Sequence, residues 1–181
     1  RLERGCPSFT MVHGERRIPV TLSVMGEHNV LNALAALAVA DYNGVPLEAA
    51  AEKLREFTGF KNRQQIREKQ GITVIDDTYN ASPDSMKAAL RVLSSFGQAR
   101  RRVAVLADML ELGELSQQGH WDSGEYARKK GVDLLVAVGP LSKDTAEGFG
   151  PGAQWFASNE EAIAYLRSQL NPGDAVLVKG S

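Results

Sequence analysis

Five short apolar runs that alternate with helical stretches constrain the fold of this chain more than any other feature. The runs lie after residue 63, and they begin at Gly71, Arg102, Asp133, Gln154 and Ala175. Short apolar runs separated by helices are typical of a parallel sheet that is buried on both faces. Two helix starts support this prediction, because Ser82 is an N-cap residue followed by proline and residues 158–161 read as a capping box. The sequence therefore predicts an α/β domain built on a parallel sheet.

The N-terminal third of the chain follows a different pattern. Residues 8–25 alternate roughly between apolar and polar side chains around a turn-like His-Gly-Glu segment, which predicts a two-stranded hairpin. Residues 29–42 are rich in alanine and leucine, and Pro46 opens a second helical segment that runs to about residue 57. The change of pattern predicts two domains, formed by residues 1–62 and 63–181.

The composition excludes several classes of protein. The chain has 181 residues, 43% of them hydrophobic and 24% charged, with a net charge of -1, which is an ordinary globular balance and makes nucleic acid a poor partner. Its one cysteine, Cys6, can form no internal disulfide, and the sequence contains neither a signal peptide nor an apolar run long enough to cross a bilayer. We therefore expect a cytoplasmic protein that binds neither membranes nor nucleic acid. Both ends, Arg1 and Ser181, read as cuts through a longer protein, since the chain starts without Met and stops soon after an apolar run.

Polar side chains follow several of the predicted strands. In open α/β sheets ligands bind beyond the carboxyl ends of the strands, so polar residues there are the first candidates for ligand binding. Three strand ends stand out, and they carry Asp76 with Asp77, Asp108, and Lys179. Carboxylates at such an end can bind ribose hydroxyls or a cation, and the amides that open the next helix can hold an anion. The pair Asp76-Asp77, followed by Tyr79 and Asn80, therefore favours a ligand site.

These residues also have a purely structural interpretation. Asp and Asn bond readily to their own backbone, so a single such residue more often forms a turn or a cap than a site. Asp108 fits equally well an acidic strand-to-helix loop that the helix dipole favours. His120 has no partner at ligand spacing and is expected to be a surface or packing residue rather than a metal ligand.

A second group of candidates lies upstream of the predicted sheet. His28, Asn29 and Asn32 fall three and four residues apart at a helix start, so they can crowd one face, and amide and imidazole groups suit the edge of a base. Spacing alone favours the plainer interpretation of an asparagine N-cap. Arg63 is either a solvated linker charge or a phosphate contact. The chain contains neither glycine-rich phosphate-binding pattern, so any nucleotide site within it is incomplete.

Together these segments resemble the Mur ligase family along nearly the whole chain. The resemblance rests on Gly-Glu-His28-Asn29-Val-Leu-Asn32, Asn-Arg63-Gln, the loop of residues 76–86, the segment around Asp108 and the terminal Lys179-Gly-Ser. The Tyr-Asn form of the loop is similar to that of the members that add D-alanyl-D-alanine to a UDP-N-acetylmuramoyl-tripeptide. Ala107 and Asn62 depart from the family pattern, which usually has Gly at both positions. The resemblance therefore does not predict the local backbone conformation at these two residues.

The resemblance implies a fold and a reaction. Residues 63–181 would form a Rossmann-like C-terminal domain with a doubly wound, mostly parallel sheet, truncated at its end, and residues 1–62 would be the end of an ATP-binding central domain. The parent enzyme, a monomer, would phosphorylate the tripeptide carboxylate with ATP and Mg, and the amine of D-alanyl-D-alanine would attack the acyl phosphate. Its phosphate loop, metal ligands and modified lysine would lie before Arg1. The chain alone would therefore hold no metal and no catalytic residue, and it would be inactive.

The resemblance also implies roles for single residues. Such chemistry depends on positioning and charge neutralisation more than on a protein nucleophile. ATP would be bound by His28, Asn29 and Asn32 at the adenine, Arg63 at phosphate, Asp77 at the ribose, and Tyr79 and Asn80 in the crevice where phosphate and dipeptide meet. The dipeptide substrate would be bound by Asn80, Ser82, Asp108 and Lys179.

Two other classes of protein share parts of this pattern. A phosphoacceptor receiver domain also carries an acidic pair, an Asp and a Lys after different strands, which Asp76-Asp77, Asp108 and Lys179 imitate. Against it, Gly rather than Pro follows Lys179, and such a domain has no place for the helical pair before residue 60. Folylpolyglutamate synthase shares the ligase architecture but lacks the Asp-Asp-Thr-Tyr-Asn loop. Both remain alternatives to a Mur ligase.

Overall fold

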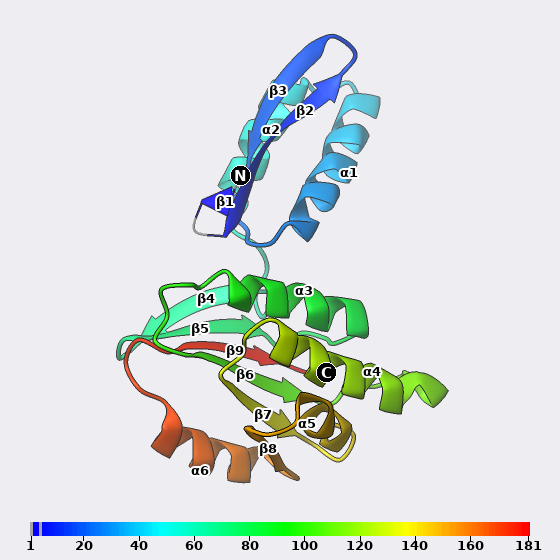
Figure 1. The fold of residues 1–181 in the computed structure, drawn as a ribbon. Coiled ribbons are helices and arrows are strands. Elements are labelled where there is room, and N and C mark those ends of the chain that lie inside the picture. The colour runs from blue at the N-terminus through cyan, green and yellow to red at the C-terminus, as the bar shows by residue number, and fades with distance from the viewer. Residues whose placement is uncertain (1, 4) are drawn as a thin grey trace. The chain divides into compact units, whose positions relative to one another are not determined.

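The computed structural model describes residues 2–3 and 5–181 of the chain, which fold into two compact units (Figure 1). By their internal contacts the units are Arg1–Phe60 and Lys61–Ser181. The predicted division after Asn62, which assigns the two parts to different functional domains, stays a prediction.

The smaller unit packs an antiparallel sheet against two helices. The strands are β1 (Leu2–Glu3), β2 (Cys6–His13) and β3 (Arg16–Thr21), and the helices are α1 (His28–Tyr42) and α2 (Leu47–Glu56). β3 turns alternate side chains inward, so Ile18 and Val20 are buried in one core with Leu37 of α1 and Leu47 of α2. The predicted hairpin and two helices are confirmed. β1, with two residues, is too short to give a periodic signal.

The larger unit is built on a six-stranded sheet. Its strands are β4 (Gln65–Lys69), β5 (Ile72–Asp77), β6 (Arg102–Ala107), β7 (Leu134–Val138), β8 (Ala153–Phe156) and β9 (Ala175–Lys179). Their order across the sheet is β4-β5-β9-β6-β7-β8, and all neighbours are parallel except β4, which pairs antiparallel with β5. All five residues of β4 are exposed, as suits a polar edge strand. No apolar run marks this strand, so the sequence pattern does not reveal it.

Helices cover both faces of this sheet, which makes it doubly wound as expected. They are α3 (Pro83–Ser94), α4 (Ser116–Lys129), α5 (Lys143–Phe149) and α6 (Asn159–Gln169), with a short 3-10 helix η1 (Gly113–Leu115) before α4. Val103 and Val105 of β6 share a core with Ala162 of α6. The alternate residues Ala104 and Leu106 are also fully buried and so face the opposite side, where α3 contacts β6 and β9. Figure 1 shows α6 across the sheet from α3 and α4.

The chain order explains this division of the helices. Connections between parallel strands are right-handed almost without exception. The strands β5, β6, β7 and β8 are added in one direction across the sheet, so α3, α4 and α5 fall on one face. α6 leads back to β9, which lies between β5 and β6, and therefore falls on the other face. The insertion of β9 brings together the carboxyl ends of three strands from distant parts of the chain.

The starts of α3 and α6 are capped by serine side chains. Ser82 Oγ accepts the N–H of Ser85 at 3.4 Å while Ser85 Oγ accepts the N–H of Ser82 at 2.9 Å, and Pro83 is the first residue of α3. At α6, Ser158 Oγ accepts the N–H of Glu161 at 3.3 Å. These bonds confirm where the sequence places the two helix starts. Among the helices of the described residues, none has the length and apolar character needed to cross a bilayer.

Candidate functional site

A buried ion pair joins the ends of β5 and β9. Asp77 and Lys179 face each other in the parallel register of these strands, and the Lys179 ammonium donates to Asp77 Oδ2 at 2.8 Å. The side chains of Lys179 and Asp77 are 2% and 11% exposed. The same ammonium donates to the carbonyl oxygen of Asn80 at 2.9 Å. Because a buried charge is unfavourable without a partner, each member of the pair fixes the other at this edge of the sheet.

The loop after β5 is fastened to Ser181 by a second set of hydrogen bonds. Asn80 Oδ1 accepts from the N–H of Ala81 at 2.8 Å and from Ser181 Oγ at 3.1 Å. The N–H of Ala81 also donates to Ser181 Oγ at 3.0 Å. Ser82, next along the loop, uses its hydroxyl to cap α3. The structure therefore brings Lys179, at the end of β9, close to the loop that contains Asn80 and Ser82. Each of these side chains already forms hydrogen bonds within the chain.

Asp108 lies just beyond the end of β6. Its Oδ1 accepts from the N–H and from the hydroxyl of Ser142, both at 2.7 Å, and its carbonyl oxygen accepts from the N–H of Ser181 at 3.1 Å. Gly139 (φ +106°) makes room for the carboxyl group, since a Cβ there would lie 2.6 Å from Asp108. Asp108 therefore ties β6 to the loop after β7 and to Ser181. Ser142 lies 34 residues away, so spacing along the chain gives no signal for this contact.

The two positions that depart from the family pattern have local explanations. Ala107 is the last residue of β6, and its methyl group lies against Gly180, where a Cβ would approach Ala107 Cβ to 2.5 Å. Asn62 has a left-handed backbone with φ 61°, a conformation that asparagine tolerates better than most residues. Ala107 fits because Gly180 has no side chain, and Asn62 fits because asparagine tolerates a left-handed backbone.

Arg63 lies on the aromatic ring of Tyr79. The guanidinium carbon is 4.0 Å from the ring centroid, within the range of a cation–π interaction, and both side chains are exposed. The N–H of Tyr79 donates to the carbonyl oxygen of Asn62 at 3.1 Å. The N–H of Gln64 donates to Asp77 Oδ1 at 3.2 Å. Three predicted ATP ligands, Arg63, Asp77 and Tyr79, are therefore brought together in the larger unit.

Side-chain hydrogen bonds through Thr78 support the same segment. The Thr78 hydroxyl donates to Asp76 Oδ1 at 2.8 Å, because an ionised carboxylate can only accept, and it must then accept from Asn62 Nδ2, 3.0 Å away. This fixes the orientation of the Asn62 amide and leaves Asn62 Oδ1 buried, with no hydrogen-bond partner among the described residues. Arg67 pairs with Asp76 Oδ2 at 3.3 Å. Asp76 thus has a structural role that its sequence position alone does not distinguish from a ligand role.

The upstream candidates lie in the smaller unit, at the start of α1. Asn29 Nδ2 donates to the carbonyl oxygen of Met25 at 2.7 Å, and Asn32 Nδ2 donates to Asn29 Oδ1 at 2.9 Å. The N-cap residue is Glu27, whose side chain makes no cap hydrogen bond, so the interpretation of an asparagine N-cap is wrong. His28, Asn29 and Asn32 share the first turns of one helix, as their spacing predicts.

His120 packs inside the larger unit. Its side chain is fully buried, Nε2 accepts the N–H of Met109 at 2.9 Å, and Nδ1 lies 2.7 Å from the carbonyl oxygen of Ser116. Nε2 is therefore unprotonated, and Nδ1 carries the proton that it donates to Ser116. In the described part of the chain, no group of three or more His, Cys, Asp or Glu side chains is arranged to hold a metal ion.

Known proteins share both the sequence and the fold of this chain. The family described as "Mur ligase, glutamate ligase domain" matches residues 62–181. A UDP-N-acetylmuramoyl-tripeptide–D-alanyl-D-alanine ligase of Mycobacterium tuberculosis is 38% identical over 99% of this chain and 40% of its own length. A crystal structure of MurF from Acinetobacter baumannii has a TM-score of 0.89 and 35% identity, over 100% of this chain and 40% of its own. MurF ligase from Thermotoga maritima in complex with ADP has a TM-score of 0.82 and 26% identity, over 98% and 40%.

The relatives match nearly the whole chain, including every segment on which the resemblance rests. The chain spans about 40% of the length of these relatives. The family match covers well over half of the chain, including the loop after β5, Asp108 and the end of β9. It confirms the expected resemblance and gives no support to a receiver domain. The chain belongs to the Mur ligase family.

Proposed function

We propose that this chain forms the C-terminal part of an ATP-dependent ligase that adds D-alanyl-D-alanine to UDP-N-acetylmuramoyl-tripeptide. The 38% identity to a ligase of that name, along 99% of the chain, is the observation that supports this most directly. The geometry supports it as well, because Asp77, Tyr79 and Asn80 lie at the carboxyl edge of the sheet, where α/β folds bind ligands. The ligase would act in the cytoplasm, as a monomer, in the peptidoglycan synthesis that cell shape and division require.

We assign the nucleotide to the group around Asp77. The Thermotoga maritima relative is described as a complex with ADP, which supports a nucleotide role for this fold. Among the described residues, each oxygen of Asp77 accepts one hydrogen bond. An ionised carboxylate has about four acceptor sites, so Asp77 can still accept from a ribose hydroxyl. Arg63 presents guanidinium donors suited to phosphate. In the smaller unit, His28, Asn29 and Asn32 present imidazole and amide groups suited to adenine.

We assign the dipeptide to the same edge of the larger unit, beside Asn80. Hydrogen bonds within the chain already engage the side chains of Ser82, Asp108 and Lys179, so these residues act by holding the backbone that faces the substrate. Asn80 is exposed, and within the described residues its Nδ2 group has no partner. That amide group can donate to a carbonyl or carboxylate oxygen of the dipeptide.

The proposed reaction forms one amide bond and uses one ATP. A carboxylate oxygen of the tripeptide takes the γ-phosphoryl group, and ADP leaves. The amine of D-alanyl-D-alanine then attacks the acyl carbon and loses a proton, and phosphate departs as its bond to that carbon breaks. Such steps depend on positioning and on neutralising phosphate charge, to which Arg63 contributes a guanidinium group. The sequence contains neither glycine-rich phosphate-binding pattern, so on this proposal another part of the enzyme would supply the phosphate loop.

A product assay with the full-length protein that contains this chain tests the proposal. The protein is incubated with ATP, Mg, UDP-N-acetylmuramoyl-tripeptide and D-alanyl-D-alanine, and the products are analysed by mass spectrometry. We expect ADP, phosphate and a tripeptide heavier by the dipeptide minus water, and no heavier product without the dipeptide. Extension of a folate by glutamate would instead favour a folylpolyglutamate synthase. Stoichiometric labelling of Asp108 by acetyl phosphate would favour a receiver domain.

A further inference from the structure

Arg63 lies between two residues with strained backbones. Asn62 and Gln64 have φ values of 61° and 49°, in the left-handed region that residues other than glycine seldom adopt. Such strain persists only where the surrounding structure over-determines it, and it concentrates at ligand-binding sites. The two flanking residues therefore fix the direction in which the Arg63 side chain leaves the backbone.

Three hydrogen bonds hold this strained segment against the end of β5 and the loop that follows it. The N–H of Tyr79 donates to the Asn62 carbonyl oxygen at 3.1 Å, and Asn62 Nδ2 donates to Thr78 Oγ1 at 3.0 Å. The N–H of Gln64 donates to Asp77 Oδ1 at 3.2 Å. The partners are three consecutive residues, the last of β5 and the first two of the loop, so the two stretches of chain hold each other in register.

The guanidinium group of Arg63 is held but not neutralised. Its central carbon lies 4.0 Å from the Tyr79 ring centroid, and in the described part of the chain no acidic side chain pairs with it. An aromatic ring attracts a cation through its face, and it covers only the flat side of the guanidinium group. The N–H donors at the rim of that group stay available to an anion.

We propose that Tyr79 positions Arg63 for a phosphate group of the nucleotide, and that the ring of Tyr79, not its hydroxyl, does this. The inference rests on the proposed nucleotide role of the site and deepens it, because it makes Tyr79 a positioning residue rather than a direct ligand. An exposed arginine without such a ring samples many rotamers. Holding it in one orientation before phosphate arrives reduces the entropy that binding would otherwise lose.

Four variants of the 181-residue chain, titrated with ATP by calorimetry, separate the ring from the hydroxyl. Tyr79→Leu removes the ring, and we expect ATP binding to weaken about two- to five-fold, the range of an exposed cation–π contact. Tyr79→Phe keeps the ring and should restore the affinity. Arg63→Met should weaken binding, and the double variant Tyr79→Leu/Arg63→Met should bind no more weakly than Arg63→Met alone.

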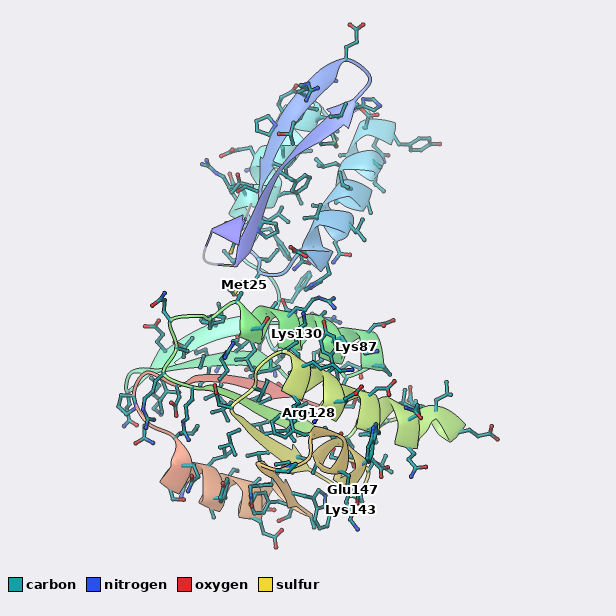
Figure 2. All side chains as sticks on the ribbon, in the orientation of Figure 1. Met25, Lys87, Arg128, Lys130, Lys143 and Glu147 are labelled. Atoms are coloured by element: carbon teal, nitrogen blue, oxygen red, sulfur yellow. The ribbon has the colours of Figure 1, made fainter. Side chains whose placement is uncertain are left out.

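Tyr126→Leu is the matched control. Tyr126 lies in α4 with the ammonium of Lys130 5.3 Å from its ring centroid, and Figure 2 shows Lys130 at the end of that helix. The variant also removes a ring that faces a cation, but one outside the loop after β5, and it should leave the ATP affinity unchanged. A loss equal to that of Tyr79→Leu would point to general destabilisation and overturn the inference.

A second measurement, by NMR, needs no ligand. The ring current of Tyr79 should move the δ-methylene protons of Arg63 upfield in the parent chain and in Tyr79→Phe, and Tyr79→Leu should return them to the position of a solvated arginine. Unshifted protons in the parent, or an ATP effect of Tyr79→Leu that persists without Arg63, would overturn the inference while leaving the nucleotide role intact. A parent chain that shows the upfield shift but binds no ATP would reject the nucleotide role, and the inference would fall with it.

Discussion

Lys179, which the family resemblance implies as a substrate contact, is buried beside Asp77 and bonded to it at 2.8 Å. Removing the ammonium would leave a buried carboxylate without its charge partner, which typically costs about 3–5 kcal/mol. We therefore predict that Lys179→Met lowers the free energy of unfolding by about 3 kcal/mol or more, as measured by urea denaturation. The control is Lys129→Met, whose pair with Glu125 is exposed and should contribute about 0.5 kcal/mol or less. Equal losses of unfolding free energy in the two variants would show that the buried pair of Asp77 and Lys179 stabilises the fold no more than an exposed pair does.

Gly139 gives a second prediction at the scale of one residue. Its φ of +106° disfavours any side chain, and a Cβ would lie 2.6 Å from the Asp108 carboxyl group. We expect Gly139→Ala to destabilise the larger unit by roughly 1–3 kcal/mol and to displace Asp108 from Ser142. Gly97→Ala is the control, because Gly97 has an ordinary φ and nothing within 4 Å of an added Cβ. Thermal unfolding of both variants is the measurement, and an unchanged midpoint for Gly139→Ala would contradict the crowding seen here.

The start of β9 is held by Asp174, at the end of the sheet opposite the candidate site. Asp174 Oδ2 accepts from Arg101 at 2.7 Å and from the N–H of Asn171 at 3.0 Å, and Arg100 lies 3.3 Å from Oδ1. Burial raises the pKa of this carboxyl group, but the hydrogen bonds from Arg101 and Asn171, with the charges of Arg101 and Arg100, outweigh burial, so the pKa lies below the usual 3.8. The ionised form is therefore the one that the fold stabilises.

A pH dependence follows for this element. Because the folded pKa is below the unfolded value, the contribution of Asp174 is fully present above about pH 4 and is lost as the pH falls through the folded pKa. We predict that the free energy of unfolding declines below about pH 4 and that Asp174→Asn flattens the decline. Asp122→Asn in α4, an aspartate without an ion pair among the described residues, should keep the parent slope. An Asp174→Asn slope equal to the parent slope would contradict the prediction.

The elements that sequence reveals are those that bury an apolar run or carry a local cap. β6 and β7 are buried along most of their length and stand out as apolar segments, and Ser82 marks the start of α3 through bonds to its immediate neighbours. β4 exposes all its residues and, among the described strands, pairs with β5 alone, so nothing in its own sequence distinguishes it from a loop. Periodicity and capping are local signals, and an exposed edge strand gives neither.

The candidate site shows the same division between local and distant causes. The acidic pair and the Tyr-Asn sequence can be recognised from the chain alone. The partnership of Asp77 with Lys179 spans 102 residues and depends on β9 being inserted beside β5, which no spacing shows. The left-handed backbone at Asn62 and Gln64 arises from contacts with residues 77–79. The sequence indicates this backbone conformation only through Asn62, which stands where the family usually has glycine.

In the proposed assignment the chain supplies groups for a base, a ribose and one phosphate, and its sequence contains neither of the glycine-rich patterns that bind polyphosphates. ADP should therefore bind to it with a dissociation constant weaker than about 1 μM, which corresponds to about -8 kcal/mol. We also expect the bound ADP to occupy one defined place on the chain. The place is the carboxyl edge of the sheet, where β5 and β9 end.

Titration of the ¹⁵N-labelled chain with ADP, followed through its amide chemical shifts, tests this most directly. We predict saturable shifts at Arg63, Asp77, Tyr79 and Asn80, and no comparable shift around Asp174 at the opposite end of the sheet. Such a result would make the end of β5 part of a nucleotide site. Saturable shifts centred on Asp174, or none near the end of β5 at millimolar ADP, would contradict it and leave Asp77 as a residue that only holds the fold.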